Sequence, residues 1–437
     1  METTVVKFGG SSLASAGQFR KVADIIRADP ARRYVVVSAP GKRDGSDIKV
    51  TDMLYRCYDL AMENSDFKTI LNAIRERFDG IIRDLNLSLD LSEEFERISA
   101  HLSHAPERDY MASRGEYLNG KVLAAYLEYP FVDPADCVCF FEEGSYDADQ
   151  SRIKLRERLS ALENAVIAGF YGALPDGTIH TFTRGGSDVT GAIVAEAVQA
   201  DLYENWTDVS GMLAADPRIV ENPRVIEYIS YQELRELSYM GATVLHEDAV
   251  FPVRRAGIPI NIRNTNDPDA PGTMIVASLP RSARRHIVTG IAGRKGFSSI
   301  QVEKSMMNSE IGFGANLLGI IAEHGLSFEH CPTGIDTFSI ILTTDTLRPC
   351  RASVLQKIRN KLHPDTLSVE DELALIAVVG EGMAYSKGVA ARVFASLAEA
   401  GINIRMIDQG SSEFNIIIAV EEQDYELALK SLYSAVM

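Results

Sequence analysis

Residues 183–218 read TRGGSDVTGAIVAEAVQADLYENWTDVSGMLAADPR, and this stretch decides the fold. It places a glycine pair between an extended run, 178–183, and a helical run, 189–200, rich in alanine and valine. Glycines between a strand and a helix let backbone N–H groups approach a ligand closely, and Ser187 and Asp188 can cap the following helix. The pattern predicts an anion-binding corner at a helix N-terminus.

A second apolar run, 200–206, ends in a further polar cluster. Thr207 and Asp208 follow it directly, then Ser210, and Asp-Pro-Arg stands at 216–218. Acidic side chains, hydroxyls and an arginine at strand ends suit a nucleotide with its divalent cation. Either cluster alone is also typical of an ordinary turn. Both together, at the ends of consecutive strands, favour a nucleotide site.

The N-terminus carries a similar corner. An apolar run that ends at Lys7 and Phe8 leads into Gly9 and Gly10, and a helix is expected over 17–28. The ammonium of Lys7 can reach phosphates that are held over the glycine pair. The spacing differs from that of a Walker A loop, which excludes the P-loop family.

Four motifs occur in order along the chain: Lys-Phe-Gly-Gly-Ser-Ser at 7–12, Ser-Arg-Gly-Glu at 113–116, Thr-Arg-Gly-Gly-Ser-Asp at 183–188 and Trp-Thr-Asp-Val-Ser-Gly at 206–211. With them the chain resembles the aspartate kinases of the amino-acid kinase superfamily, over nearly its whole length. The resemblance implies an α/β fold with a mostly parallel central sheet between helices. It also implies that ATP phosphorylates the side-chain carboxylate of L-aspartate to 4-phospho-L-aspartate, the first intermediate toward lysine, threonine, methionine and diaminopimelate.

The resemblance implies roles for the residues of these motifs. The catalytic roles fall on Lys7, Arg184 and Asp188. Arg184 would hold the α-carboxylate of aspartate and Glu116 its ammonium, and the expected substrate contacts are Ser11, Thr51, Glu116, Arg184 and Ser187. The expected nucleotide contacts are Lys7, Gly9, Gly10, Gly186, Thr207, Asp208, Ser210, Asp216 and Arg218. Mg²⁺ is expected as the ATP-bound ion, with no separate metal site in the protein.

This chemistry needs no general base. A substrate carboxylate has a pKa of about 3.9 and is already ionised at neutral pH. One departure from the family pattern matters: the family often has a lysine directed at the phosphates, whereas this chain has Thr243 within Gly-Ala-Thr-Val-Leu-His-Glu at 241–247. Arg218 or another cation must then supply that charge.

The composition restricts the class of protein. The 437 residues are 46% hydrophobic and 24% charged, enough for two or three domains, and the net charge of −17 argues against nucleic-acid or anionic-membrane binding. Five scattered cysteines predict core thiols and a cytoplasmic protein, with Cys137 and Cys139 on one face of a strand over 137–141. No apolar run approaches membrane-spanning length.

Strands at 4–8 and 34–38 around the first helix predict a βαβ unit and a parallel sheet. Residues 51–128 are expected to be helical, with Thr51 either a helix N-cap or a substrate contact. Gly115 in a helix costs roughly 1 kcal/mol against alanine, and the close approach of a ligand would explain it. Further expectations are strands near 131–133, 164–170 and 257–263, a helix over 229–249 broken at 239–242, and an exit from the first domain over 264–285.

The tail contains an ungapped duplication, in which residues 312–345 align with 388–421. Each copy predicts a loop, an amphipathic helix ended by glycine, a strand, a turn and an apolar strand. The unit resembles the ACT domain, a βαββαβ module that pairs with another copy and binds amino acids at the interface. The expected domains are therefore a kinase domain over 1–285 and two ACT domains over 286–370 and 371–437, whose strands are possible partners of one another.

In the family the tandem pair mediates dimer contacts and feedback inhibition, so a homodimer or higher homo-oligomer is expected; a purely structural role is the alternative. The candidate effector residues are Met307, Ser309, Gly312, Phe313 and Glu329. They favour lysine as the effector, and threonine or joint control stays open.

Two other functions stay open. A superfamily member acting on glutamate, acetylglutamate or a nucleotide monophosphate would share the glycine corners, but the Ser-Arg-Gly-Glu helix and the tandem tail argue against it. A non-catalytic amino-acid sensor would fit Thr243, although Lys7, Arg184, Asp188 and Asp208 speak against it. Because no homoserine dehydrogenase segment follows Met437, the chain is expected to be monofunctional.

Overall fold

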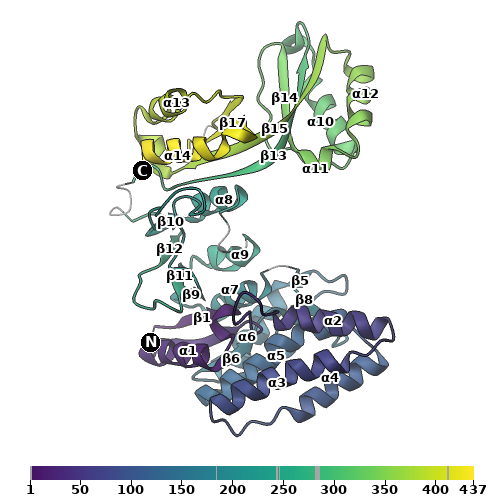
Figure 1. Cartoon of the computed structure of the whole chain (residues 1–437), viewed down its shortest axis with the longest axis vertical. Helices are drawn as coiled ribbons and strands as arrows, with labels where there is room; N and C mark the ends of the chain where they lie inside the picture. The colour runs from purple at the N-terminus through teal and green to yellow at the C-terminus, as the bar shows by residue number, and fades with distance from the viewer. Residues whose placement is uncertain (1, 184, 243–244, 246, 281–285, 411–412) are drawn as a thin grey trace. The chain divides into compact units, whose positions relative to one another are not determined.

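The computed structural model describes residues 2–183, 185–242, 245, 247–280, 286–410 and 413–437, without the side chains of 247–249. These residues form two compact units (Figure 1). The first consists of Met1–Met212, Val225–Tyr231 and Val244–Leu279, and the second of Leu213–Arg224, Gln232–Thr243 and Pro280–Met437. Each unit is described by itself below.

The first unit contains a mostly parallel sheet whose order, over the described residues, is β10-β12-β11-β9-β1-β2-β6-β3. Its strands are β1 (Thr4–Phe8), β2 (Arg32–Val37), β3 (Phe131–Val132), β6 (Ala165–Ala168), β9 (Leu202–Thr207), β10 (Tyr228–Ser230), β11 (Ile260–Asn264) and β12 (Thr273–Val276). Neighbours pair in parallel except β11 with β12. The central strands are buried on both faces, which explains their continuous β-branched runs.

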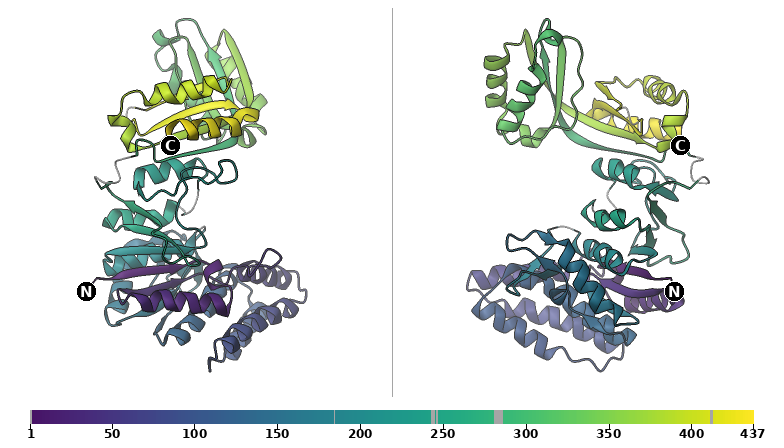
Figure 2. Two further views of the ribbon diagram at one scale, coloured as in Figure 1. Left: turned by 60° about the vertical axis from the view of Figure 1, so that its left-hand side comes forward. Right: turned by 180° about the vertical axis from the view of Figure 1, so that it is seen from behind.

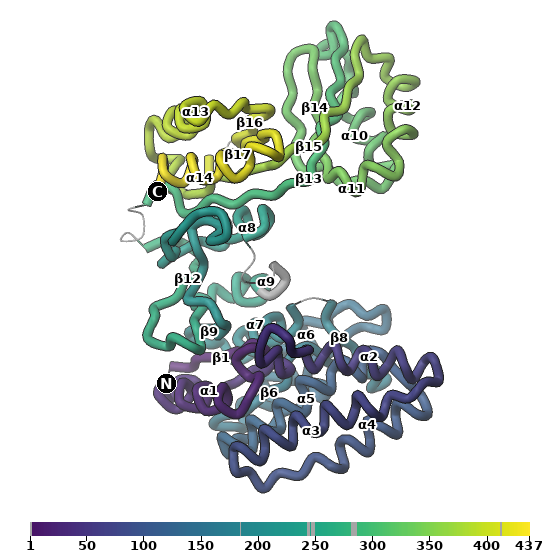
Figure 3. Tube along the Cα trace, in the orientation of Figure 1, coloured from purple at the N-terminus to yellow at the C-terminus, as the bar shows by residue number. Residues whose placement is uncertain are grey.

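Helices cover both faces of this sheet. On one face lie α1 (Ala16–Ala28) and the helices α2 (Val50–Met62), α3 (Lys68–Asp84), α4 (Ser92–His104) and α5 (Arg108–Leu127), which run side by side (Figure 3). On the other face α7 (Gly186–Val198) packs on β1, β2 and β9, flanked by α6 (Ala148–Ser160) and α9 (Glu247–Ala256). A small sheet adds β4 (Cys139–Phe140), β5 (Tyr146–Asp147), β7 (Tyr171–Ala173) and β8 (Ile179–Thr181).

The second unit contains a sheet in the order β14-β13-β15-β17-β16 over its described residues. The strands are β13 (Gly290–Glu303), β14 (Thr337–Thr343), β15 (Thr366–Val379), β16 (Met406–Asp408) and β17 (Asn415–Glu421). The helices are α8 (Tyr231–Tyr239), α10 (Phe313–Glu323), α11 (Thr344–Leu347), α12 (Arg351–Leu362), α13 (Val389–Glu399) and α14 (Tyr425–Val436). Figure 2 shows α10 and α12 together on one side of β13 and β14, where they enclose one core, while α13 and α14 enclose another with β15 and β17.

Two long strands run through both halves of this sheet. The first half of β13 pairs with the second half of β15, which also pairs with β17, and the second half of β13 pairs with both β14 and the first half of β15. The register shifts between Lys295 and Ser299, where Gly296 has a φ of 94° and Glu372 a φ of 58°. The two copies of the duplication therefore share their central strands.

The expected first βαβ unit, the helical residues 51–128 and the repeat helices that end before Gly325 and Gly401 are confirmed. Other boundaries differ in part. The helix expected over 229–249 begins with a strand, β10, and only then continues as α8 and α9; its expected break at 239–242 is confirmed, because α8 ends at Tyr239. Helix α9 continues to Ala256 because Val250 and Val253 are buried despite Pro252. The expected domain exit, 264–285, contains the end of the first unit at Leu279, but it also contains β12, which pairs with β11. Of the strand 137–141 only β4 forms, because Asp133 caps a 3-10 helix, Pro134–Asp136, before Cys137.

Candidate active site

An ion pair between buried Lys7 of β1 and partly buried Asp188 of α7 is the centre of the site. Lys7 Nζ lies 2.5 Å from Asp188 Oδ1, and Asn205 Nδ2 of β9 donates to the same oxygen at 2.8 Å. The hydroxyl of Tyr203 donates to the Asp188 carbonyl at 3.1 Å. Lys7 and Asn205 are register partners on neighbouring parallel strands, so their side chains share a sheet face. The ammonium is held at the carboxyl end of β1 by a carboxylate that is itself hydrogen-bonded.

Backbone contacts shape the glycine corner after β1. The N–H of Gly9 donates to the Trp206 carbonyl at 3.0 Å, and the N–H of Gly41 donates to the Gly10 carbonyl at 2.7 Å. A Cβ at Gly10 would lie 2.8 Å from the Ala39 carbonyl oxygen. Glycine is thus required there by the packing of the chain itself. The same corner brings the loop after β2 against the start of η1 (Ser11–Leu13).

The second corner lies at the start of α7. Gly185 is its N-cap, with a φ of 57° and no side-chain cap hydrogen bond, so the prediction that Ser187 and Asp188 cap this helix was wrong. Asp188 lies in the first turn and points to Lys7 instead. A Cβ at Gly186 would come within 2.5 Å of the Phe170 ring, which gives this glycine a packing role. The N–H groups at a helix start lack intrahelical partners and favour an anion.

Helix α5 meets the loop after β2 at Gly115. A Cβ on Gly115 would lie 2.6 Å from the Cβ of Ala39, so the glycine is explained by contact with the chain's own loop and not by the expected approach of a ligand. The side chain of Asn119, one turn later, donates to the Ser38 carbonyl at 2.6 Å. Helix α5 therefore fixes residues 38–41, which in turn contact the glycine corner.

Glu116 on the same helix has a buried carboxyl group, one oxygen of which accepts no hydrogen bond from the described residues. Its Oε2 has no hydrogen-bond partner among the described residues, and the residue is 5% exposed. Burial raises the pKa of Glu116 to about 8, although the backbone of Ala39 and the charge of Lys7 act in the opposite direction. A buried carboxyl of this kind ionises readily when a cation, such as an ammonium group, is placed beside it.

Replacing Gly115 by alanine is expected to lower the free energy of unfolding by about 1–3 kcal/mol, because the new methyl overpacks against Ala39. The matched control is Gly80→Ala on α3, where the nearest neighbour of the added Cβ is the end of Arg83 at 3.8 Å. That change should raise the free energy of unfolding by about 1 kcal/mol. Urea titration of both variants measures the difference, and equal effects of the two would contradict the packing argument.

The end of β9 is tied to the segment that follows β11. The N–H of Thr265 donates to the Thr207 carbonyl at 2.9 Å, and Asn264 Nδ2 donates to Ser210 Oγ at 2.9 Å. Thr207 Oγ1 donates to Asp208 Oδ1 at 3.2 Å, and Asp208 is exposed. The expected nucleotide residues of this segment therefore lie in the same unit as Lys7 and the glycine corner.

Other expected residues are not placed with these. Asp216 and Arg218 pair with each other in the second unit, with Nη2 and Oδ2 2.6 Å apart, and hydrogen bonds from Arg218 lower the pKa of Asp216. Arg184 and Thr243 lie outside the described residues. Thr51 is in the first turn of α2, whose N-cap is Lys49, so the N-cap alternative for Thr51 was wrong.

The expected effector residues are in the second unit. Gly312, with a φ of 82°, is the N-cap of α10, and Phe313 is buried in the core that α10 shares with α12. Met307 is buried and Ser309 exposed in η4 (Met307–Ser309). Glu329 is already engaged, because it accepts a hydrogen bond from Tyr239 at 2.5 Å and lies 3.6 Å from Arg294.

The structure also adds three residues that sequence reasoning missed. They are Asn205, Asn119 and Arg77, of which Arg77 donates to the carbonyls of Ile48 and Gly41 and pairs with Asp47 at 3.3 Å. Asn205 had a usable signal, because a polar residue in the middle of an apolar strand alternates onto the face of Lys7. Asn119 lies on the same helix as the Ser-Arg-Gly-Glu motif, and Arg77 lies on a helix far from all four motifs; neither residue carried such a signal.

Cys57 and Cys137 are buried, and burial raises the pKa of each thiol to about 12, while Cys139, Cys331 and Cys350 are half-buried. Cys137 follows a 3-10 helix, so the expected common strand face with Cys139 was wrong. Within the described part of the chain no cluster of three or more His, Cys, Asp or Glu could hold a metal ion. No helix within it is long and apolar enough to cross a membrane.

Comparison with known proteins relates this geometry to a family. The model of the amino acid kinase family matches residues 2–264, and that of an ACT domain matches residues 376–436. Aspartokinase 3 of Bacillus subtilis is 42% identical, covering 98% of this chain and 97% of its own length. The crystal structure of Clostridium acetobutylicum aspartate kinase has a TM-score of 0.90 and 46% identity, with full coverage of both chains. E. coli aspartokinase III in complex with aspartate and ADP has a TM-score of 0.75 and 27% identity, again with full coverage.

The chain belongs to the amino acid kinase family, with ACT-type architecture in its tail. Within that family it is one of the aspartokinases, and it is an ATP-dependent kinase. The predicted family and the α/β fold class are thereby confirmed.

Proposed function

We propose that this chain transfers the γ-phosphoryl group of ATP to the side-chain carboxylate of L-aspartate, which yields ADP and 4-phospho-L-aspartate. The observation that carries the proposal is the Lys7–Asp188–Asn205 group at the carboxyl ends of β1 and β9, in the same unit as the buried carboxyl of Glu116. Support comes from E. coli aspartokinase III, which was crystallised with aspartate and ADP.

The proposed roles follow from charge. Lys7, held by Asp188, donates to the transferring phosphoryl group and stabilises the charge that spreads over its oxygens. The glycine corners at 9–10 and 185–186 lie against the phosphates, and Gly10 and Gly186 present their backbone N–H groups to phosphate oxygens, whereas the N–H of Gly9 holds the corner to the Trp206 carbonyl. Glu116 binds the ammonium of aspartate, and Arg184 its α-carboxylate as a bidentate fork. Ser11, Thr51 and Ser187 add polar contacts to the substrate, and Thr207, Asp208 and Ser210 serve the nucleotide. Asp216 and Arg218, which pair with each other in the second unit, stay predicted nucleotide contacts.

Mg²⁺ is part of this proposal. It usually binds proteins through one or two carboxylates together with substrate phosphates. Asp208 fits that pattern, since it is exposed at the end of β9 next to the hydroxyl of Thr207. The ion would neutralise charge on the phosphate oxygens of ATP.

We further propose that the tail regulates the kinase and joins two copies of the chain. The expected first ACT domain exposes four large apolar side chains on its loops: Met306, Ile311, Phe328 and Ile335. Exposed apolar side chains that gather on a surface are typical of a protein contact. E. coli aspartokinase III was also crystallised with lysine and aspartate, which supports lysine as the effector at Met307, Ser309, Gly312, Phe313 and Glu329, with threonine as the alternative. The proposal includes a kinase domain over 1–285, ACT domains over 286–370 and 371–437, and a location in the cytoplasm.

A trapping assay tests the activity. Incubation with ATP, Mg²⁺ and L-aspartate, followed by hydroxylamine, should give a hydroxamate, because hydroxylamine attacks acyl phosphates. L-glutamate serves as the parallel acceptor, and lysine and threonine are added to further samples. Aspartate-dependent hydroxamate that lysine suppresses supports both proposals. Amino-acid binding without product would instead favour the non-catalytic sensor, and product with glutamate would favour a different acceptor.

A further inference from the structure

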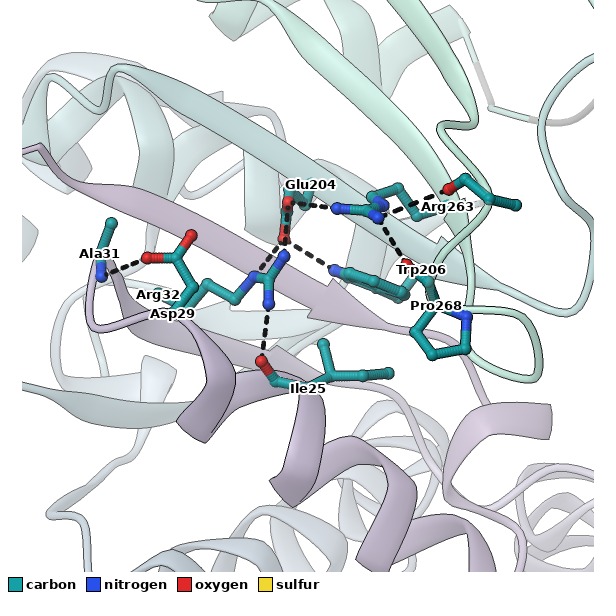
Figure 4. Close-up of polar contacts among 9 residues, drawn as sticks. Ile25, Asp29, Ala31, Arg32, Glu204, Trp206, Arg263 and Pro268 are labelled. Carbon is teal, nitrogen blue, oxygen red and sulfur yellow. Dashed lines mark hydrogen bonds and ion pairs between the residues drawn. The ribbon is translucent and has the colours of Figure 1, made fainter.

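A buried charged cluster lies on the face of β9 opposite to Asn205. We call it the Glu204 cluster; it consists of Arg32, Glu204, Trp206 and Arg263 (Figure 4). Glu204 is 3% exposed and uses both carboxylate oxygens. Its Oε2 accepts from Arg32 Nε at 2.8 Å and from Trp206 Nε1 at 2.9 Å, and its Oε1 accepts from Arg32 Nη2 at 3.1 Å and Arg263 Nη1 at 3.4 Å. The Glu204 carboxylate thus connects β9 to β2 through Arg32 and to β11 through Arg263, and it also holds the indole of Trp206 two residues along the same strand.

The cluster holds the indole ring of Trp206 from several sides. The guanidinium carbons of Arg32 and Arg263 lie 5.3 Å and 4.7 Å from the ring centre. The ring of Phe8 stacks on it, with centroids 5.9 Å apart and planes inclined by 21°. Cation–π and stacking contacts both depend on ring orientation, so these neighbours favour one position of the indole.

Trp206 stands between two segments that the proposed function gives to the nucleotide. Its carbonyl accepts the N–H of Gly9 at 3.0 Å, and the next residue is Thr207. Phe8, which stacks on its ring, directly precedes Gly9. A shift of the indole therefore moves the glycine corner and the end of β9 together.

Arg263 extends the cluster to the loop after β11. Its Nη2 donates to the carbonyls of Pro268 at 2.6 Å and Ala270 at 3.4 Å. Thr265 in that loop bonds Ser12 at 2.8 Å, hydroxyl to hydroxyl, and its N–H donates to the Thr207 carbonyl. Through the loop after β11, the Glu204 cluster thus also contacts the segment that follows the glycine corner, at Ser12, and the end of β9, at Thr207.

From these contacts we propose that Glu204 is a positioning residue for the nucleotide: through Trp206 and Arg263 it sets the separation of the Gly9–Gly10 corner and the Thr207–Asp208 turn. Without its charge the guanidinium groups of Arg32 and Arg263 lose the carboxylate that they share and keep only their backbone carbonyl partners, so their positions beside the indole are no longer fixed. The nucleotide side of the site then loosens, while Glu116 on α5 keeps its own supports. The inference rests on the proposed function, because it uses the nucleotide assigned there.

The test is Glu204→Gln in the full chain, compared with wild type in the hydroxamate assay. The KM for ATP should rise about tenfold, the magnitude typical for loss of a partner behind a ligating group, while the KM for aspartate stays within about twofold. Trp206 is the sole tryptophan of the chain, so its emission reports the cluster directly. In the variant the emission should shift to longer wavelength and become more sensitive to acrylamide, and ADP with Mg²⁺ should reverse both changes.

Glu94→Gln is the matched control, because Glu94 pairs with Lys121 between α4 and α5, apart from the cluster. It should leave the KM for ATP and the tryptophan emission unchanged. Equal KM values for ATP in Glu204→Gln and wild type would overturn the proposal even if the variant melts earlier, since a purely structural role predicts that pattern. If Glu204→Gln does not fold, Arg263→Lys, which keeps the charge but loses the contacts to two carbonyls, is judged by the same criteria. An inactive wild type whose emission still responds to ADP would refute the aspartate kinase proposal and leave the positioning role standing.

Discussion

Lys7→Ala is expected to lower kcat by about a hundred- to a thousandfold, the loss seen when one preorganised donor to a charged transition state is removed. The KM for aspartate should change much less, because Lys7 is proposed to contact the phosphoryl group. The ammonium is held in place by Asp188, which Asn205 supports, so its effect depends on position as well as charge. The measurement is steady-state hydroxamate formation with each substrate varied in turn.

The control for this variant is Lys68→Ala, which removes an exposed lysine at the start of α3. It should leave both kcat and KM unchanged. Asp188 keeps its hydrogen bond from Asn205 in the variant, so the variant should still fold. Near-normal kcat in Lys7→Ala would remove Lys7 from the mechanism.

Glu116→Gln is expected to raise the KM for aspartate about ten- to a hundredfold, because a hydrogen bond to a charged group contributes about 1.5–3 kcal/mol. It should also abolish a pH dependence of the wild type. Burial raises the pKa of Glu116 to about 8, so the carboxyl is mostly protonated at pH 7, whereas the substrate ammonium requires its ionised form. The wild-type KM for aspartate should therefore fall as the pH rises from 6 to 8, and aspartate binding should release a proton.

The same shift affects stability with a definite sign. The pKa of Glu116 is higher in the folded than in the unfolded protein, so its contribution to the free energy of unfolding is fully present below about pH 4.5 and is lost as the pH rises through about 8. As the pH rises over that range, the free energy of unfolding of the wild type should therefore fall relative to that of Glu116→Gln. Glu76→Gln, an exposed change on α3, should show neither effect. A flat wild-type KM between pH 6 and 8 would contradict the assignment.

The parts of the fold that the sequence predicted are those with a strong local signal. The apolar runs that became β1, β2 and β9, and the glycines after them, needed no knowledge of tertiary contacts. The duplication in the tail was likewise detected from the sequence alone. Boundaries failed where tertiary packing outweighed local preference: α9 continues past Pro252, and β12 forms in a proline-rich segment because β11 offers it an edge.

The sequence predicted the motif residues of the site, but it did not predict the residues that hold those motifs in place. Gly115 illustrates why: the sequence shows that a glycine stands in a helix, but only the packed structure shows that the methyl of Ala39 occupies the space beside it. Asn119 and the Glu204 cluster contact residues distant in sequence: Asn119 does so because α5 packs on the loop after β2, and the Glu204 cluster because of strand register. Such pairings depend on tertiary structure and leave no mark at a fixed spacing.

The long shared strands of the second unit make its two repeats depend on each other. Over the described residues, the first half of β13 pairs with β15 alone, and the first half of β15 pairs with β13 alone. Each of these half-strands therefore has its hydrogen-bonding partner only while the other long strand is present. A chain cut between the repeats would leave half of each long strand without its partner, so the two copies can be gained or lost only as a pair.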